Sequence, residues 1–187
     1  MRYEKGHKEA TRQKIVEVAA AEFRRNGIEG IGVADLMAKA GLTHGGFYSH
    51  FKSKEELVRA AMEEAAKKSR FRKIAEDGGS LEDIVRMYLR PETRDVPERG
   101  CAIAALVSEI GRHSLETRKG LTTSVERLLG IIETRLPEGT VGRRKTAIGI
   151  FSAIMGALQL ARTVSDKNLS DQILEAGIEA ALNLANK

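Results

Sequence analysis

The sequence predicts an all-α protein of about nine helices, and three observations carry that prediction. Apolar residues recur at spacings of three and four along most of the 187 residues, as they do on the buried face of a helix. No segment shows the alternation of apolar and polar residues that is typical of a strand. Short breaks containing glycine, proline or asparagine separate the helical stretches. We therefore expect a purely helical fold, and we find no internal repeat.

Three helices are expected in the N-terminal third. The first covers residues 11–25, and Gly27 ends it. The second is a short helix over residues 33–40, ended by Gly41, because glycine enters a left-handed turn without steric cost. The third is a short helix over residues 43–50, for which Thr43 is a suitable N-cap.

The later helices are marked by caps and breaks. Ser53 and Glu56 have the spacing of a capping box, which predicts a long helix from Ser53 to about Ala75. Ser80 caps the next helix, and Pro91 is expected to end it. The least regular loop is predicted over residues 90–99, which contain two prolines. Four more helices are predicted at residues 100–112, 115–136, 141–164 and 170–186.

Composition excludes several classes of protein. An apolar fraction of 42% beside 30% charged residues is ordinary for a soluble globular chain. Cys101 is the single cysteine, which excludes an internal disulfide and a zinc site of the CxxC type. Four scattered histidines make a histidine cage for a metal unexpected, so we expect neither a metal nor a cofactor.

Two further segments bear on location. Residues 1–5 are charged and lead into no apolar run, unlike a secretory signal. The longest apolar stretch covers residues 147–161, which is shorter than the roughly 20 residues that a membrane span needs. We expect this stretch to be a buried helix in a cytoplasmic protein without a membrane partner.

The positive charge is concentrated at the N-terminal end. The net charge is +5, and residues 1–54 carry ten Lys or Arg against six Asp or Glu, a net of +4. The other 133 residues carry 21 basic and 20 acidic side chains. Such a segment is often only a solvated face, but it suits an anionic partner.

A pair of short helices joined by a tight turn lies inside that basic segment. Residues 33–40, the turn at Gly41 and residues 43–50 have the construction of a helix-turn-helix unit. In such units the first helix crosses the DNA backbone and the second enters the major groove. Gly45 and Gly46 each cost about 1 kcal/mol in a helix relative to alanine, which makes sense where the backbone must approach a duplex.

Side-chain spacing separates two faces of the expected third helix. Phe47 and Phe51 are four residues apart and should face the core. His44 and Tyr48 should face outward, together with the pair formed by Ser49 and His50.

These residues resemble the DNA-binding domain of TetR-type transcriptional regulators, the tetracycline repressor family. The resemblance covers about residues 8–62, and the remainder matches only in the number and length of its helices. It is carried by the pattern Thr11-Arg12-x-x-Ile15, Ala19-x-x-x-Phe23, Gly27, Val33-x-x-Leu36, Ala40-Gly41-Leu42-Thr43-x-Gly45-x-Phe47-Tyr48-x-His50-Phe51-x-Ser53-Lys54-Glu55-x-Leu57.

The resemblance implies a homodimer that binds a palindromic double-stranded DNA operator. By family position, phosphates would be contacted by Thr43, Tyr48, His50 and Lys54, and base edges would be approached by His44, Gly45 and Gly46. Two positions depart from the family pattern. Gly32 stands where a serine or threonine usually caps the second helix and touches a phosphate, and Gly46 lacks a side chain that often contacts bases.

The resemblance also implies a division of labour along the chain. Residues 1–54 would form the helix-turn-helix domain, and residues 55–187 a helical domain for effector binding and dimerisation, linked by the long helix from Ser53. The function implied is that of a transcriptional regulator, a repressor released by an unknown small-molecule effector. The small residues Gly149, Ala153, Gly156 and Ala157 would let helices approach closely, either in a dimer seam or in the chain's own core.

Candidate residues for an effector pocket are weaker than those for DNA binding. They are Met87, Tyr88, Cys101, His113, Phe151 and Met155. Methionine and aromatic residues at helical spacing are also typical of an ordinary core, and a histidine near a helix end is also favoured by the helix dipole.

The sequence bears on three alternative functions. The chain has no nucleophile elbow, HExxH motif or P-loop lysine, and Gly27, Gly30 and Gly32 lack the preceding strand of a phosphate loop, so we do not expect an enzyme. A helical interaction module that does not bind DNA is the second alternative. The third is a regulator that senses thiol-reactive compounds or electrophiles through Cys101, since Arg99 and a helix N-terminus favour a thiolate, although a free cysteine is commonly an inert apolar residue.

Overall fold

The computed structural model describes residues 5–186, and this part of the chain is helical without strands. The prediction of an all-α fold is confirmed, with ten α-helices and two short 3₁₀ helices among the described residues. Residues 1–5, which are not expected to form a secretory signal, lie almost wholly outside the described residues, because the described part of the chain begins at residue 5. The elements are α1 (Lys5–Asn26), α2 (Val33–Lys39), η1 (His44–Ser49), α3 (Lys54–Lys67), α4 (Arg70–Glu76), α5 (Leu81–Tyr88), α6 (Pro91–Asp95), η2 (Pro97–Arg99), α7 (Ala102–Ile110), α8 (Leu115–Glu133), α9 (Arg143–Thr163) and α10 (Lys167–Ala185).

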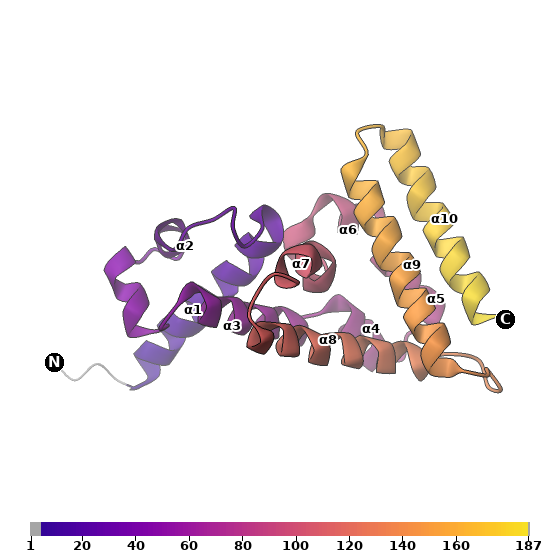
Figure 1. The fold of residues 1–187 in the computed structure, drawn as a ribbon, viewed down its shortest axis with the longest axis horizontal. Coiled ribbons are helices and arrows are strands. Elements are labelled where there is room, and N and C mark those ends of the chain that lie inside the picture. Colours follow the sequence, from indigo (N-terminus) through magenta and orange to yellow (C-terminus); the bar gives the residue numbers. More distant parts are fainter. Residues whose placement is uncertain (1–4, 187) are drawn as a thin grey trace.

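The molecule is elongated, and its two ends are built from different helices. In Figure 1 helices α1, α2 and α3 lie at one end, and the antiparallel pair α9 and α10 lies at the other. Helix α8 runs lengthwise between them, and α7 lies near the middle. This arrangement places the helix-turn-helix unit far from the C-terminal helix pair.

Two hydrophobic cores correspond to these two ends. The N-terminal core is formed by α1, α2, η1 and α3, and Phe47 and Phe51 are each 1% exposed within it, as predicted. Leu106 and Ile110 from α7 complete the same core. The C-terminal core is formed by residues of α4, α5 and α7 to α10. Helix α7 therefore contributes to both cores.

The long helix predicted to run from Ser53 to about Ala75 is interrupted, which corrects that prediction. Helix α3 ends at Lys67, and α4 begins after Ser69, whose backbone is extended. The break has a packing reason. Met62 belongs to the N-terminal core, whereas Phe71 turns into the C-terminal core, where its ring meets that of Tyr88 edge-on at 6.2 Å.

The stretch predicted as the least regular loop, residues 90–99, is also more ordered than expected. Pro91 is the first residue of α6 and not merely the end of α5, and η2 follows directly. Proline suits the first position of a helix because its missing N–H would have no partner there. The sequence pattern predicted that Pro91 ends the preceding helix, but it did not predict that Pro91 also begins α6.

Two glycine turns and the N-cap of α3 are confirmed, and one predicted capping box forms only in part. Gly27 and Gly41 adopt φ angles of 79° and 70°, the left-handed region in which glycine carries no penalty. Ser53 caps α3 by accepting a hydrogen bond from the amide of Glu56. The Glu56 carboxylate accepts from the amide of Lys52 and not from that of Ser53, so the predicted capping box is only half formed.

Helix α9 contains the long apolar stretch of the sequence. It is the helix that is long and apolar enough, by length and composition only, to cross a membrane. Its residues Ile150, Ile154 and Leu158 are fully buried against the rest of the chain, as in the core helix of a folded protein. A Cβ built on Gly177 of α10 would lie 2.4 Å from the Cβ of Ala157, so α9 and α10 approach closely within the chain itself.

Candidate nucleic-acid interface and adjoining cavity

The element expected to enter DNA is a 3₁₀ helix, η1, where a short α-helix was predicted. Consecutive glycines disfavour a regular α-helix, which accounts for the difference. The turn before it is held by backbone hydrogen bonds from Gly41 to Ala38 and from Leu42 to Met37, each 2.9 Å long. These bonds fix η1 relative to α2.

The side chains of η1 divide between the core and solvent. The Phe47 ring is buried and stacks on Phe51 at 5.7 Å. The ring of Tyr48 stands edge-on to Phe47 at 5.2 Å and is 66% exposed. His44 is exposed and lies 6.2 Å from Tyr48, measured between ring centroids. The buried phenylalanines thus hold two exposed rings at the tip of the domain.

The paired glycines of η1 are not required by the packing of the protein. A Cβ added to Gly45 would meet nothing within 4 Å. A Cβ added to Gly46 would make only ordinary contacts, at 3.7 Å, with Met37 and Thr43. Neither glycine is among the described residues with a positive φ. Packing among the described residues therefore does not account for the absence of side chains at these two positions.

The other residues expected to contact DNA surround η1. Thr43 is exposed, and its hydroxyl makes no capping hydrogen bond. Lys54 lies in the first turn of α3, and its ammonium is 3.8 Å from the Glu29 carboxylate. His50 is half-buried with an unpartnered Nδ1, and burial, followed by the nearby charges of Lys8 and Arg12, lowers its pKa. His50 is therefore neutral at pH 7.

The first turn of α3 is bonded to the C-terminal part of the chain. The Glu55 carboxylate accepts hydrogen bonds from Thr117 Oγ1 (2.5 Å) and Ser114 Oγ (2.8 Å), and it lies 2.7 Å from Nδ1 of His113. Burial raises the pKa of Glu55, but these hydrogen bonds outweigh it and lower the pKa to about 2. His113, expected as a pocket residue, takes part in this contact and does not line the cavity.

A second contact joins α1 to the segment before α7. Arg24 donates to the backbone carbonyl of Glu98 from Nε, at 2.8 Å, and from Nη2. Arg25 is ion-paired with the Glu98 carboxylate at 2.6 Å. The Glu109 carboxylate accepts from the amide of Ile28 at 2.8 Å. The N-terminal end is thus bonded both to η2 and to α7.

A cavity of about 160 Å³ lies where these parts meet. Its walls come from α1, α3, α4, α5, α7 and α8, with the segment at residues 99–101 on one side. Three of the residues expected in an effector pocket line it, namely Met87, Tyr88 and Cys101. The structure therefore brings together residues from both ends of the molecule around one space.

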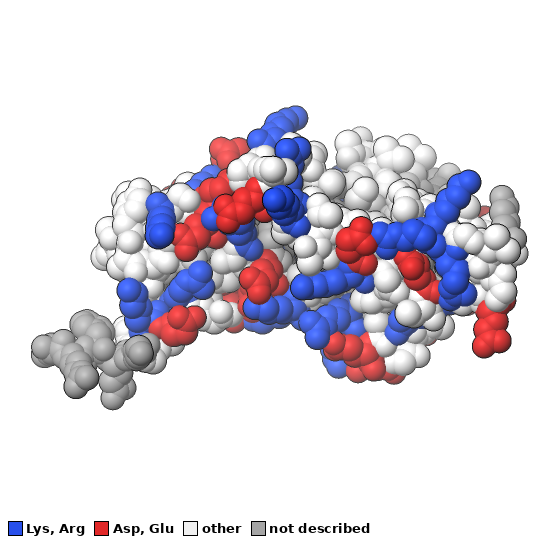
Figure 2. Space-filling model, turned by 60° about the horizontal axis from the view of Figure 1, so that its bottom comes forward, with Lys and Arg blue, Asp and Glu red and all other residues white. Residues whose placement is uncertain are grey.

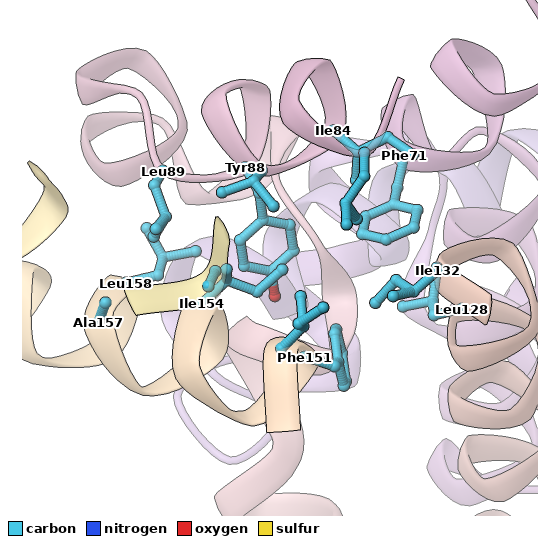
Figure 3. Close-up of a cluster of buried hydrophobic side chains, with 14 of the residues drawn as sticks. Phe71, Ile84, Tyr88, Leu89, Leu128, Ile132, Phe151, Ile154, Ala157 and Leu158 are labelled. Carbon is cyan, nitrogen blue, oxygen red and sulfur yellow. The ribbon is translucent and has the colours of Figure 1, made fainter. Parts of the chain in front are cut away.

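The other candidates lie in or beside the C-terminal core. Phe151 is buried, and its ring meets Tyr88 edge-on at 6.3 Å. Met155 is partly buried against the same core. Figure 3 shows Tyr88 projecting from α5 toward α9, with Ile154 beside its ring and Phe151 further along. These residues support the wall that Tyr88 forms, and they are not part of the lining.

The charged residues of the cavity are not among those predicted from the sequence. Arg24 lines it together with Glu17 and Ala20, which lie seven and four residues earlier on the same face of α1. That spacing was a usable signal. It was hidden because α1 also supplies the N-terminal core, which accounted for its apolar residues.

The outer surface carries charges of both signs. On the face drawn in Figure 2, lysines and arginines are interleaved with acidic residues along the length of the molecule. This face shows no large patch of one sign. The effect of the positive charge excess of residues 1–54 therefore depends on where each charged side chain lies, because the excess does not form one uniformly positive surface.

The comparisons with known proteins agree with this geometry. A family model described as bacterial regulatory proteins of the tetR family matches residues 15–61. The regulator TtgR of Pseudomonas putida is 36% identical over 63 residues, which cover 34% of this chain and 30% of TtgR. The match thus spans less than a third of the length of this curated relative.

Solved structures match over nearly the whole chain. A TetR transcriptional regulator from Chloroflexus aurantiacus superimposes with a TM-score of 0.75 at 26% identity, over 96% of this chain and 94% of that one. The reduced form of NemR from E. coli gives a TM-score of 0.75 at 20% identity, over 93% and 96% of the two chains. The overall fold is therefore that of these regulators, including the part without curated sequence matches.

Proposed function

Since this chain belongs to the TetR family of transcriptional regulators, which are not enzymes, we propose that it is a repressor that binds a palindromic operator as a homodimer and is released by a small effector. The single observation that carries the proposal is the exposed, glycine-bearing 3₁₀ helix η1, held rigidly beside α2. The family match also favours DNA binding over an interaction module that does not bind DNA.

In this proposal η1 enters the major groove, which is wide enough for one helix with its side chains. Tyr48, Thr43, His50 and Lys54 contact phosphates. His44 approaches base edges, and Gly45 and Gly46 let the backbone come close. The exposure of Tyr48 and His44 and the open space around Gly45 support this assignment.

The dimer is proposed to form through α9 and α10. Ile148 and Leu160 of α9 are 46% and 59% exposed, which is unusual for large apolar side chains. Between them Gly156 has nothing within 4 Å of an added Cβ, so a second helix could approach there. Twofold symmetry would then present two copies of η1 to successive half-sites of a palindrome.

The domain boundary is proposed after residue 54, with residues 1–54 as the DNA-binding domain and 55–187 as the effector and dimer domain. The cavity is the proposed effector site, and the cytoplasm the proposed location. A ligand can shift DNA binding only if it binds the DNA-incompetent arrangement more tightly. The hydrogen bonds of Arg24 to the Glu98 carbonyl and of the Ile28 amide to Glu109 cross between the two parts and support such coupling.

The test is selection of bound fragments from the genome of the source organism, followed by affinity measurements over a salt series. We expect specific duplex binding that weakens steeply from low to moderate salt, because neutralised phosphates release counterions. Binding to no genomic fragment, or binding that does not respond to salt, would end the proposal.

A second candidate is regulation through modification of Cys101. The thiol is half-buried, lines the cavity and occupies the N-cap of α7. A Cys101→Ser variant that still binds its operator but no longer responds to thiol-reactive compounds would favour this candidate. A variant with an unchanged response would exclude it.

A further inference from the structure

Two arginines beside the cavity are partly buried without an acidic hydrogen-bond partner. Arg24 donates to the carbonyl of Glu98, and Arg162 donates from Nη2 to the carbonyl of Thr93 at 2.7 Å. Both acceptors are neutral. The Glu98 carboxylate itself is ion-paired with Arg25. Burial lowers the pKa of both Arg24 and Arg162, and charges taken from water are ordinarily paired with an opposite charge.

Tyr88 belongs to the same wall, but its hydroxyl does not face the open space. The side chain is 2% exposed and lines the cavity, and its Oη is buried. Burial, followed by the neighbouring Cys101 thiol, raises the pKa of Tyr88 well above its usual value, so the hydroxyl keeps its proton. Tyr88 therefore forms part of the wall and is not assigned to ligand binding.

Arg24 is a partly buried cation among the residues that line the cavity. The carboxylates that could bind a cationic ligand there already form ion pairs within the protein. Glu17 and Glu64, the carboxylates of the lining, are both ion-paired with Lys68, at 2.7 and 2.8 Å.

The rest of the lining defines a small apolar space with a basic rim. The apolar wall is formed by Ala20, Met62, Phe71, Met87, Ile103, Leu128 and Ile131. Arg70, Arg99 and Arg127 line the cavity and are exposed. An apolar cavity of about 150 Å³ holds a molecule the size of benzene, so a volume of about 160 Å³ suits one ring or a short chain.

We propose that this cavity binds a small organic monocarboxylate, whose carboxylate is held by Arg24 and whose one-ring or short-chain body packs against the apolar wall. This inference rests on the proposed function only in taking the cavity as the effector site. The guanidinium supplies the charge, so a neutral amide of the same shape lacks the main attraction. Charge-assisted hydrogen bonds are roughly twice as strong as neutral ones.

The test is calorimetric titration of the DNA-free protein at pH 7.5 with benzoate, phenylacetate and hexanoate, each beside its own amide. We expect at least one acid to bind about tenfold or more tightly than its amide. Arg24→Gln should abolish that preference, and Arg24→Lys should keep part of it. Arg86→Gln is the matched control, because Arg86 is exposed, ion-paired with Glu82 and absent from the lining.

Three outcomes would overturn the inference. They are binding of none of the acids, equal binding of acid and amide, and an acid preference that survives Arg24→Gln but is lost in Cys101→Ser. Thermal melts show whether each variant is folded, and Arg24→Lys keeps the test valid if Arg24→Gln is not. Operator affinity measured without acid reports separately on the proposed function, so either proposal can fail while the other stands.

Discussion

At the scale of single residues, the buried phenylalanines and the exposed rings of η1 have separate tasks. Phe47 and Phe51 fix the element in the N-terminal core, and Tyr48 and His44 stand outside it. Substitutions at the exposed positions should therefore change binding without changing the stability of the fold. Surface substitutions away from caps and networks typically alter stability by less than about 0.5 kcal/mol.

Tyr48→Ala should weaken binding to every duplex by about tenfold, a loss of about 1.4 kcal/mol, because a phosphate contact carries no sequence information. His44→Ala should instead relax the preference at particular base pairs. Competition gel shifts with operator variants separate the two effects. If both variants bound all sequences as the parent does, η1 would not be the recognition element.

Gly177 gives a residue-scale test of packing between α9 and α10. Gly177→Ala should lower the free energy of unfolding by about 1–3 kcal/mol, because overpacking a tight contact displaces its neighbours, here Ala157. Gly130→Ala in α8 is the control, since an added Cβ meets nothing within 4 Å there. Denaturant titration measures both. Equal stability of the two variants would contradict the close approach of α9 and α10.

At the scale of elements, α3 joins η1 to the later helices. It begins at Lys54, after the four residues that follow η1, and carries Glu55, which is bonded to Thr117 in the first turn of α8. Its interruption at Lys68 and Ser69 lets α4 follow the C-terminal core.

Glu55→Gln should lower stability at pH 7 by about 1–3 kcal/mol, the cost of weakening a hydrogen-bonded carboxylate. Because the folded-state pKa is depressed to about 2 from an ordinary value of 4.5, the Glu55 contribution is complete above about pH 4.5. It is lost as the pH falls toward 2. The difference in unfolding free energy between parent and variant should shrink across that window.

Other carboxylates with lowered pKa values, such as Glu17 and Glu98, titrate in the same acid range. The comparison must therefore be made against the variant and not on the parent alone. Glu76→Gln, in an exposed pair with Arg72, is the control and should have little effect. A parent–variant difference that stays constant from pH 7 to pH 2.5 would refute the assigned role.

Apolar periodicity and helix-breaking residues were enough to predict most helices from the sequence, because helix faces and glycine turns depend on nearby residues. The prediction failed where contacts between distant parts of the chain determine the structure. Nothing near Ser69 in the sequence announces the break that turns Phe71 into the C-terminal core. The same holds for Arg24, whose role depends on the carbonyl of Glu98, 74 residues away. Residue patterns found η1 and three lining residues of the cavity, but not its charge.

At the scale of the whole molecule, the exposed face of α9 is the feature that the single chain leaves unexplained. Leu160 is 59% exposed and belongs to α9, which Figure 1 shows at the end of the molecule opposite α1, α2 and α3. Partner helices seated there would bury it and fix the separation of two η1 elements. Operator binding and dimerisation should thus be lost together.

Leu160→Arg should shift the protein toward monomers and weaken operator binding by at least tenfold, because a buried unpaired charge is costly at an interface. Light scattering coupled to size-exclusion chromatography gives the mass, and gel shifts give the affinity. Arg86→Gln again serves as a surface control. A dimeric Leu160→Arg variant with full operator affinity would place the seam elsewhere.

The contribution of α7 to the N-terminal core has a practical consequence for protein engineering. A chimaera that grafts residues 1–54 onto the body of another regulator would leave Leu106 and Ile110 behind. The transplanted head would then rest on foreign side chains of different size, with voids or clashes beneath α1. Functional hybrids should therefore carry the matching face of α7 with the graft, whatever operator they are meant to address.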